Sequence, residues 1–521
     1  MLQPKQFANN NPAQDLTVEM QRFNPVVKKL SDVAAFLGIT PDVTWHEIET
    51  TGLSSDSNAI NEGEIFLALP GAKTHGGAYA QIAVGRGARA VITDNAGAEL
   101  TSQQHLAIPV LVVPNPRSQS GYVSDWFFNS PSKSMYVAGI TGTNGKTTTT
   151  FLLHQIWKFA QHESGLIGTI GIKLGDEFQP GIRTTPEADA VQSILSVMHE
   201  RHIRDVAMEA SSHALVQHRL DGVHFSAAGF TNLTQDHLDF HGDMENYYQA
   251  KRSLFTAEFS DHAFINIDNE FGLRLASETT ISTSTLSLRN RKATWHFDAI
   301  HSIQDSSSTG YQVSIRGEGG VLIEGRILLA GEFNLENCLL AVAIAFNSGV
   351  DPLVIGHALE TLSGAPGRLE RIECGQQYEA LVDYAHTPDA VTQVLKTLSL
   401  RKAGKLIGVL GCGGDRDKGK RAQMGRALNE NCEVAIFTSD NPRSEDPVQI
   451  LQEMTTGIDL NSQSKVIVDR EAAIEYAVSV AQPGDVLVVL GKGHESGQEV
   501  KGVVTPFSDQ ETLRKKIKAH L

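Results

Sequence analysis

Short apolar runs, each followed directly by glycine or polar residues, recur along the chain in three blocks. In the first block such runs lie at residues 64–69, 90–93 and 110–113, with a helix-like stretch rich in glycine and alanine before the second run. Apolar runs of this length bounded by turn residues are typical of buried strands, and their alternation with helix-like segments indicates an α/β fold. The Asn-Ser-Pro-Ser-Lys stretch at 129–133 predicts a linker after this block.

The second block opens with the apolar run 135–140, followed by a glycine-rich loop and a helix-like segment. In that segment the apolar side chains of Leu153, Ile156, Trp157 and Ala160 share one face. Further buried strands are predicted at 205–208, 227–230 and 263–267, with an antiparallel patch around 295–329. The Gly-Ala-Pro-Gly stretch at 364–367 predicts the end of the block.

The third block repeats the pattern of apolar run and polar loop at 380–382, 406–410, 434–438, 465–468 and 486–490. In an open α/β sheet, ligands bind at the carboxyl ends of the strands, so the residues after each run are the place to look for function. We therefore expect three α/β domains, which span residues 1–133, 134–364 and 365–521.

The composition fits a globular protein with several hydrophobic cores. The chain has 521 residues, of which 41% are hydrophobic and 20% are charged. No apolar run reaches the roughly 18 residues of a membrane-spanning helix. Residues 1–25 also lack the apolar segment of a secretory signal. We therefore expect a cytoplasmic protein that does not insert into a membrane.

Charge and cysteine content exclude other classes of protein. The formal net charge of -16 repels nucleic acid, and no basic run overrides it. An anionic ligand must then be held by a local group of cations and backbone N–H groups. The cysteines show neither a CxxC pair nor a His/Cys metal spacing, so each is expected to be a small buried residue. They are Cys338, Cys374, Cys412 and Cys432.

The strongest motif is Thr-Gly-Thr-Asn-Gly-Lys-Thr-Thr at 141–148, which follows a predicted strand and opens a predicted helix. It ends like a phosphate-binding loop, in which the lysine contacts phosphates and the following hydroxyl binds Mg²⁺. Ile140 occupies the first glycine position of the strict pattern. The alternative, a turn with a chance lysine, is disfavoured because strand, loop and helix are all in place.

Carboxylate and imidazole side chains follow two other strands of the second block. Glu209 stands at the end of one predicted strand, where it can hold a metal near the phosphates, since Mg²⁺ prefers carboxylate oxygen. Asp236 and His237 follow the strand 227–230. Taken singly, His237 is more often a core or capping residue, and Lys251 in a helix-like segment is more often a surface lysine.

Three polar loops follow strands in the third block. Their sequences are GCGGDRDKGKR at 411–421, DNPR at 440–443 and GKGHE at 491–495. Together they bring Arg416, Lys418, Lys420 and Arg443 to one predicted sheet edge. The pattern predicts a cationic pocket inside an acidic chain.

In this order, the motifs TGTNGKTT, EASSHALVQHR, TNLTQDHLDFHGD, GEFNLEN, VDYAHTPDA, GCGGDRDKGKR, DNPRSEDP and GKGHE resemble those of the Mur ligases. Within that family the match is to members that add meso-diaminopimelate to a UDP-linked muramoyl dipeptide. The resemblance runs from about Ser55 to Glu495. It implies a uridine-binding N-terminal α/β domain, a central P-loop ATPase-like domain and a Rossmann-like C-terminal domain.

The resemblance implies the following sites for ATP and metal. ATP is expected at Gly142, Thr143, Asn144, Gly145, Lys146, Thr147, Thr148 and Asn337. Mg²⁺ is expected at Thr147, Glu209, His237 and Lys251, the last as a carbamate. A cationic lysine cannot bind Mg²⁺, whereas its CO₂ adduct presents an anionic oxygen pair. Lys146, Lys251, His237 and Glu209 are thus the expected catalytic residues.

The resemblance also implies two sites for the other substrates. The UDP-linked substrate is expected at Ser55, Ser57, Thr184, Thr185, Ser211, Gln217 and Arg219. Arg183 stands where family members often carry asparagine, so the contact there departs from the family pattern. Diaminopimelate is expected at Arg416, Asp440, Asn441, Pro442, Arg443, Gly491 and Glu495.

The implied reaction forms an amide bond in peptidoglycan synthesis. ATP converts the D-glutamyl γ-carboxylate to an acyl phosphate, which the amine of diaminopimelate attacks. Two Mg²⁺ ions and Lys146 are expected to neutralise charge during phosphoryl transfer. The expected enzyme is a monomer whose C-terminal domain closes over its small-molecule substrates.

Two kinds of alternative remain open from the sequence. Within the enzyme class they are the lysine-adding relative and a folylpolyglutamate-type synthetase, against which DNPR and the long GCGGDRDKGKR motif argue. From another class, a nucleotide-binding regulator without catalysis is disfavoured by the intact set of Lys146, Glu209, His237 and Lys251. A panel of amino acids in an ADP-release assay separates these alternatives.

Overall fold

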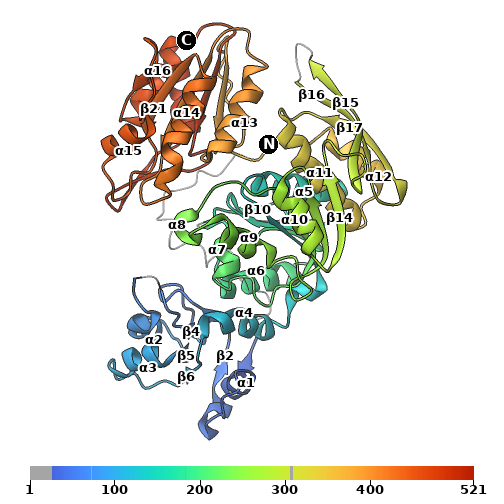
Figure 1. Cartoon of the computed structure of the whole chain (residues 1–521). Coiled ribbons are helices and arrows are strands. Elements are labelled where there is room, and N and C mark those ends of the chain that lie inside the picture. The colour runs from blue at the N-terminus through green and yellow to red at the C-terminus, as the bar shows by residue number, and fades with distance from the viewer. Residues whose placement is uncertain (1–25, 72, 182, 305–308) are drawn as a thin grey trace, which may run out of the picture.

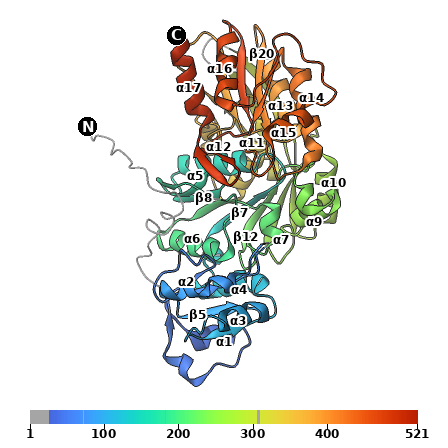
Figure 2. The same ribbon diagram turned by 90° about the vertical axis from the view of Figure 1, so that its left-hand side faces the viewer.

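The computed structural model describes residues 26–71, 73–181, 183–304 and 309–521. Three sheet-based domains stack along one axis, with the N-terminal domain at one end and the C-terminal domain at the other (Figures 1 and 2). The predicted α/β class with three domains is confirmed. Residues 1–25, for which we expected no signal segment, lie outside the described residues.

The N-terminal domain has a parallel sheet in the order β3-β4-β5-β6, with apolar side chains on both faces. Its strands are β3 (Leu53–Ser54), β4 (Ile65–Leu67), β5 (Ala90–Thr93) and β6 (Val110–Val112), and a separate pair is β1 (Lys28–Lys29) and β2 (Glu49–Thr50). Its helices are α1 (Leu30–Phe36), α2 (Ala80–Gly85), α3 (Asn95–Ser102) and α4 (Pro116–Phe127). The three predicted strands are confirmed.

The expected linker at 129–133 is instead a packed connection. A 3-10 helix spans Pro131–Ser134, and both Pro131 and Ser132 are buried. Proline fixes its own φ near the helical value, which suits the first position of such a turn. The first and second domains are therefore joined by a short, ordered element.

The central sheet has the order β10-β9-β8-β11-β7-β12-β13-β14-β15-β16-β17 and is parallel from β8 to β15. Its strands are β7 (Tyr136–Thr141), β8 (Ser164–Gly168), β9 (Gly171–Leu174), β10 (Glu177–Gln179), β11 (Asp205–Glu209), β12 (Phe225–Phe230), β13 (Ser260–Asn266), β14 (Ser282–Ser287), β15 (Trp295–Gln304), β16 (Thr309–Arg316) and β17 (Leu322–Ile327). The predicted antiparallel patch is confirmed as β15, β16 and β17. The apolar pattern of the sequence did not predict β8, β9 and β10, which lie at one side of this sheet.

Helices cover both faces of the central sheet. One face packs against α5 (Lys146–Phe159), α11 (Glu332–Asn347) and α12 (Pro352–Leu359). The other packs against α6 (Ala188–Glu200), α7 (Ser212–Val216), α9 (Met244–Arg252) and α10 (Glu270–Glu278), with the short α8 (Leu238–His241) beside α9. The phosphate-loop motif lies between β7 and α5, at the carboxyl edge of the sheet.

The C-terminal sheet has the order β18-β19-β23-β20-β21-β22, and only the β18 pairing is antiparallel among its described ladders. Its strands are β18 (Glu370–Arg371), β19 (Glu379–Asp383), β20 (Leu406–Cys412), β21 (Val434–Ser439), β22 (Lys465–Val466) and β23 (Val486–Leu490), followed by a hairpin of β24 (Gly497–Val500) and β25 (Val503–Pro506). Helices α13 (Pro388–Ser399), α14 (Arg421–Asn431) and α15 (Pro447–Met454) cover one face, and α16 (Arg470–Val480) and α17 (Asp509–His520) cover the other.

Two smaller expectations need correction. The strand predicted at 465–468 is shorter, because β22 is an exposed edge strand of two residues. Three of the cysteines are buried, but Cys374 is only partly so.

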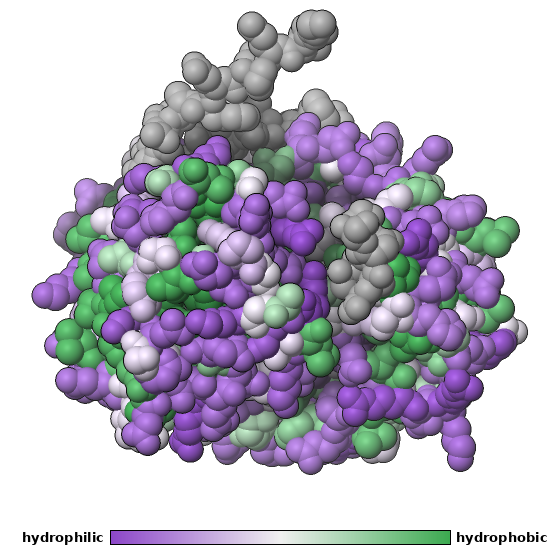
Figure 3. Space-filling view, turned by 90° about the horizontal axis from the view of Figure 1, so that it is seen from above, coloured by the Kyte–Doolittle hydropathy of each residue, from purple (hydrophilic) through white to green (hydrophobic). Residues whose placement is uncertain are grey.

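The surface seen from above the C-terminal domain is mainly hydrophilic, with hydrophobic side chains in separate groups (Figure 3). Among the described residues, no helix is long and apolar enough to cross a membrane.

Candidate active site

The phosphate-loop motif adopts a backbone that requires glycine at two positions. Gly142 has φ +145° and Gly145 has φ +91°. A Cβ atom at Gly142 would lie 1.9 Å from Thr231 Oγ1, and one at Gly145 would lie 2.3 Å from Asn337 Oδ1. Ile140 lies inside β7, so the missing first glycine of the motif does not affect the loop. The backbone therefore turns sharply into the N-terminus of α5.

The first N–H groups of this loop are already used inside the protein. The N–H of Thr143 donates to the Asn232 carbonyl at 2.9 Å, and that of Asn144 donates to Asn232 Oδ1 at 3.0 Å. The N–H groups from Gly145 to Thr148 stand at the start of α5, where a helix leaves such donors free of intrahelical partners. This end of the helix is suited to bind phosphate.

Two lysines converge on the same backbone carbonyl. Lys146 Nζ donates to the carbonyls of Gly142 and Thr143, both at 2.9 Å, and Lys251 Nζ donates to the Gly142 carbonyl at 2.8 Å. Lys251 is only 1% exposed, so a surface role for this lysine is wrong. Burial, together with the positive charge of Lys146, holds the pKa of Lys251 well below its usual range.

Glu209 ends β11 and is completely buried beside the phosphate loop. Its carboxylate accepts hydrogen bonds from Thr147 Oγ1 at 3.0 Å, and from the Thr169 N–H and hydroxyl at 2.7 and 3.0 Å. These neutral donors leave the buried negative charge for a cation to balance. Glu209 and Thr147 therefore fit a Mg²⁺ site of oxygen ligands.

The described residues contain no group of three or more His, Cys, Asp and Glu side chains that could hold a metal. Of the expected Mg²⁺ ligands, only Glu209 and His237 are residues of these four types, so the expected site does not require a group of three. Burial lowers the pKa of His237 to about 2, which keeps its imidazole neutral and able to bind a metal. Lys251 fits the set only after its amine has become a carbamate.

Asp236 forms a charged junction between the central and C-terminal domains. Lys420 Nζ donates to Asp236 Oδ1 at 3.0 Å, and His386 Nε2 lies 3.6 Å from Oδ2. His237 Nε2 lies 3.4 Å from the same Oδ2 atom. Although burial opposes it, these partners hold the pKa of Asp236 well below its usual range. Asp236 is visible in the sequence, but its partners in the other domain are not.

The residues expected to grip the muramoyl dipeptide lie around the end of β11. The Thr185 hydroxyl donates to the Glu209 carbonyl at 2.7 Å and lies 3.2 Å from Ser211 Oγ. Arg219 donates to Gln217 Oε1 at 2.6 Å and forms an ion pair with Glu187 at 3.0 Å. Glu187 also pairs with Arg183 and, at 3.3 Å, with Arg117, so these three arginines share one carboxylate.

The two serines expected at the uridine site have different surroundings. Ser55 is held by Asp189 of α6, whose carboxylate oxygens each accept one hydrogen bond at 2.9 Å, from the N–H and from the hydroxyl. Burial raises the pKa of Asp189 to about 6. Ser57 is buried. The Ser55 contact links the first two domains beside the expected uridine site.

The expected amino-acid pocket is a cavity of about 260 Å³ at the carboxyl edge of the C-terminal sheet. Of the residues expected there, the lining includes Arg416, Asp440, Asn441, Arg443, Gly491 and Glu495. Pro442 is not in this lining. It forms the turn between Asn441 and Arg443, where its carbonyl would lie 1.9 Å from a Cβ atom at Gly414.

Three of the four cations that the sequence places at this pocket have acidic partners within the protein, and the fourth, Arg416, donates to the Asp415 carbonyl at 3.2 Å. Lys420 binds Asp236 as described, and Lys418 binds Glu445 at 3.1 Å. Arg443 donates to the Gly414 carbonyl at 2.8 Å and lies 3.4 Å from Glu499. The pocket is therefore less cationic than the sequence predicts.

Lys492, which was not among the residues expected at this site, is fully buried. Its ammonium donates to Glu495 Oε2 at 2.8 Å and to Asn441 Oδ1 at 3.0 Å. It stands inside the GKGHE motif, so its position was visible but its burial was not.

Arg368 was also missed, although it directly follows the Gly-Ala-Pro-Gly stretch. Its guanidinium donates to Thr147 Oγ1 at 3.2 Å and lies over the Tyr384 ring at 4.2 Å. Arg368 therefore links the nucleotide loop to the C-terminal domain.

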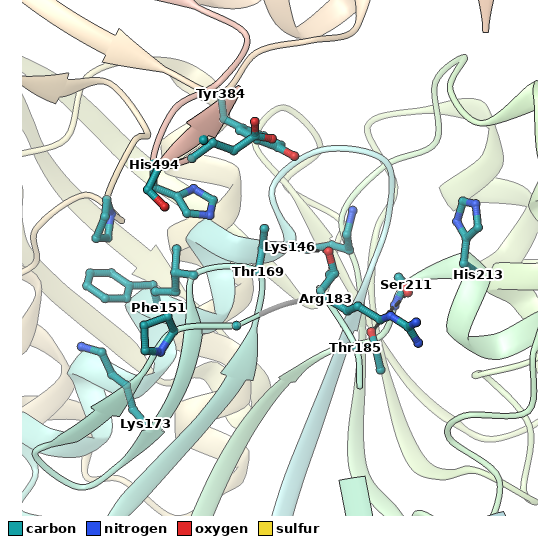
Figure 4. A pocket seen from close by; sticks show the side chains of 18 of the residues that line it. Lys146, Phe151, Thr169, Lys173, Arg183, Thr185, Ser211, His213, Tyr384 and His494 are labelled. Carbon is teal, nitrogen blue, oxygen red and sulfur yellow. Dashed lines mark hydrogen bonds between the residues drawn. The ribbon is translucent and has the colours of Figure 1, made fainter. Parts of the chain in front are cut away.

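One larger cavity of about 1230 Å³ joins these parts. Its lining includes Lys146, Lys251 and His237 of the central domain, and Arg416 and Arg443 of the C-terminal domain. Figure 4 shows Lys146, Thr185 and Ser211 on one side, with Tyr384 and His494 approaching from the C-terminal domain. The nucleotide loop and the amino-acid pocket thus open into the same space.

Comparison with known families now adds independent information. The Mur ligase middle domain matches residues 140–345, the glutamate ligase domain of Mur ligases matches 367–493, and the Mur ligase catalytic domain matches 49–116. The chain belongs to the Mur ligase family. It is therefore an ATP-dependent, amide-forming ligase that uses Mg²⁺.

Individual relatives are similar to this chain along most of their length. The UDP-N-acetylmuramoyl-L-alanyl-D-glutamate–2,6-diaminopimelate ligase of Streptomyces coelicolor is 44% identical over 496 residues, covering 94% of this chain and 96% of its own. The ligase of the same name from Geobacillus thermodenitrificans is 37% identical over 479 residues, covering 90% and 95%.

Solved structures extend the comparison to the fold. A ligase of the same name is 32% identical, with a TM-score of 0.64, and the match covers 95% of this chain and 99% of that one. A folylpolyglutamate synthase from Mycobacterium tuberculosis shares the fold at 17% identity, with a TM-score of 0.59 over 72% of this chain and 92% of its own.

Proposed function

We propose that this Mur ligase adds meso-diaminopimelate to the D-glutamate γ-carboxylate of UDP-N-acetylmuramoyl-L-alanyl-D-glutamate, a step of peptidoglycan synthesis. The observation that carries the proposal is the single cavity that holds Lys146 and Lys251 at one end and Arg416 and Arg443 at the other. The name shared by the bacterial relatives supports the same substrates. The reaction runs through an acyl phosphate, because a carboxylate must first be activated before an amine can displace its oxygen.

The phosphate end of the cavity holds ATP. The N–H groups from Gly145 to Thr148 face the phosphates, and Lys146 leaves the loop carbonyls to contact the transferred phosphoryl group. Asn337 lies against Gly145 and helps to place the nucleotide. When bound, Mg²⁺ neutralises negative charge on the phosphates. Thr147, Glu209, His237 and a carbamate of Lys251 would hold it.

The acceptor enters between the first two domains. Ser55 and Ser57 contact the uridine end, and Thr184, Thr185, Ser211, Gln217 and Arg219 hold the muramoyl dipeptide. Their position around the end of β11 supports this role, because it brings the dipeptide to Glu209 and the phosphate loop. The γ-carboxylate then attacks the terminal phosphoryl group, ADP leaves, and the acyl phosphate remains in the shared cavity.

Diaminopimelate is a zwitterion with two ammonium and two carboxylate groups, so its pocket must offer both signs of charge. Arg443 and Arg416 bind the distal carboxylate, for which a guanidinium has the matching fork. Glu495, Asp440 and the Gly491 carbonyl accept from the distal ammonium, while Asn441 and Pro442 shape the loop. The free amine attacks the acyl phosphate, the amide bond forms, and phosphate leaves.

We infer that the enzyme works in the cytoplasm as a monomer. ATP and a UDP-linked precursor are cytoplasmic metabolites, which supports this compartment.

A panel of amino acids tests the substrate assignment. Purified enzyme is given ATP, Mg²⁺ and the UDP-linked dipeptide with meso-diaminopimelate, L-lysine, D-glutamate or no amino acid. We expect ADP and tripeptide product with meso-diaminopimelate, and at least about 10³-fold lower kcat/KM with L-lysine, since the lost carboxylate leaves Arg443 without its substrate partner. Efficient use of L-lysine, or ADP release without any product, would contradict the proposal.

A further inference from the structure

We propose that Arg470, held by Asp509, is a positioning residue that sets the distance between two loops of the amino-acid pocket and thereby the affinity for diaminopimelate. The inference rests on the proposed function of that pocket. Arg470 and Asp509 lie outside the cavity lining, and none of the motifs that identify the family contains them.

The guanidinium of Arg470 ties together the ends of two strands. Nη1 donates to the Ser439 carbonyl at 3.1 Å, and Nη2 donates to the Leu490 carbonyl at 2.9 Å. Ser439 is the last residue of β21, and Leu490 is the last residue of β23. The next residues along the chain begin the DNPR and GKGHE loops of the pocket.

These two strand ends have no ladder hydrogen bonds to each other. In the sheet order, β20 lies between β23 and β21, so the two ends are about 9 to 10 Å apart, or two strand spacings. A planar guanidinium with several donors can bridge carbonyls over such a gap, whereas a single hydroxyl or ammonium reaches fewer of them. Arg470 therefore constrains a spacing that the sheet by itself leaves less defined.

Asp509 fixes the orientation of the Arg470 guanidinium. Arg470 Nε donates to Asp509 Oδ1 at 2.8 Å, and Nη2 donates to Oδ2 at 2.7 Å. Both side chains are completely buried, so the pair cannot reorient into water. Asp509 is the first residue of α17, which brings the last helix of the chain under the pocket loops.

The same guanidinium lies in the electric field of the pocket acids. Although burial alone would lower the pKa of Arg470, the negative charges of Asp509, Asp440 and Glu495 raise it. Asp440 and Glu495 line the cavity and belong to the two loops that Arg470 spaces. Arg470 thus offsets part of the repulsion between these acids as well as holding their backbones.

Two conservative variants test the proposal, each removing one property of the pair. Asp509→Asn keeps the shape and removes the charge, while Arg470→Lys keeps the charge and removes the fork. Glu379→Gln is the matched control, because Glu379 pairs with Arg401 at 2.9 Å at the opposite edge of the same sheet. Steady-state kinetics are measured for each of the three substrates, with L-lysine as the competing amino acid and thermal unfolding in parallel.

We expect both variants to raise the KM for diaminopimelate by about 10-fold or more, the size of one lost charged hydrogen bond. The KM values for ATP and for the UDP-linked dipeptide should stay within about twofold, and the preference over L-lysine should fall. Glu379→Gln should leave all of these values near wild type. A split confined to diaminopimelate is the result that a merely structural pair would not give.

Each of three results overturns the proposal. The first is a folded variant with an unchanged KM for diaminopimelate, the second is a loss of affinity for all three substrates together, and the third is a failure of both variants to fold. The Arg443→Ala variant distinguishes a failure of the positioning role from a wrong assignment of the pocket. If Arg443→Ala changes diaminopimelate kinetics and the Arg470 and Asp509 variants do not, the pocket stands and the positioning role falls. If none of the three changes them, the pocket itself is wrong.

Discussion

The nucleotide loop and the amino-acid pocket, which share one cavity, hold their charges in opposite ways. At the loop, Lys146 and Lys251 both donate to the Gly142 carbonyl, and among the described residues no carboxylate lies within ion-pair distance of either. In the pocket, Arg443 lies beside Glu499, and Lys492 binds Glu495. Among the described residues, the two lysines of the loop thus have no carboxylate partner, whereas Arg443 and Lys492 of the pocket each have one.

The difference follows from the ligands that the two regions are proposed to bind. ATP carries several negative charges, so a site for it gains from cations that no protein carboxylate has neutralised. Diaminopimelate has no net charge, so its site needs both signs at fixed places. Burial also acts differently in the two regions, because it pushes the unpaired Lys251 toward its neutral amine.

The largest expected effect comes from removing the unbalanced charge. Lys146→Ala should lower kcat/KM by on the order of 10³-fold, because transition-state charge on the phosphoryl group loses its partner. The thermal midpoint of the ligand-free protein should stay close to wild type. Lys515→Ala, which changes an exposed lysine of α17 that pairs with Glu471 at 3.3 Å, is the control. Near-normal turnover of Lys146→Ala would remove the ATP-site assignment.

Lys251 tests whether the second lysine of the loop region acts as an anionic carbamate. Lys251→Ala should lower activity by on the order of 10²-fold, and short carboxylic acids should restore part of it. The lowered pKa keeps the amine neutral and reactive toward CO₂, so activity should fall as pH falls and added bicarbonate should oppose that loss. A carbamate signal in carbon NMR with labelled bicarbonate, absent from the variant, is the direct measurement. Full activity of wild type in CO₂-free buffer would contradict this role.

Arg443 tests the balanced region. Arg443→Ala should raise the KM for diaminopimelate by about 10²-fold, since a charged hydrogen bond to the substrate is lost and Glu499 is left without its partner. The KM values for ATP and the UDP-linked substrate should hardly change. Arg426→Ala, on the exposed side of α14, should leave all of the kinetics unchanged. A uniform rise in all three KM values would place specificity elsewhere.

The smallest effect concerns Asp189, a buried carboxylate outside both regions. Its pKa is raised from 3.8 to about 6, so it stabilises the fold most below pH 4, and this contribution is lost as pH rises through 6. Relative to Asp189→Asn, the wild-type protein should gain about 1 kcal/mol of unfolding free energy between pH 7 and pH 5. Parallel thermal midpoints for the two proteins across this range would show that Asp189 does not titrate there.

The sequence predicted most of the strands that carry site residues, because continuous apolar runs between turn residues are local signals. It did not predict β8, β9 and β10, where glycine and charged residues interrupt the apolar pattern at a sheet edge. The sequence also identified Asp236 and Glu495 as site residues, but not the lysines that pair with them. Lys420 lies 184 positions from Asp236, and no local pattern reports such a pairing.

The sequence itself determined the succession of strands along the chain, the glycines of the phosphate loop and the residue types at each strand end. Gly142 and Gly145 follow from steric limits on φ that hold in any context. Only the tertiary structure decided which charges are balanced, which lysine is buried and how far apart the pocket loops stand. Burial and Coulomb interaction depend on distances between segments remote in sequence, so Lys251 becomes a buried amine and Arg470 a bridge only once the domains have packed.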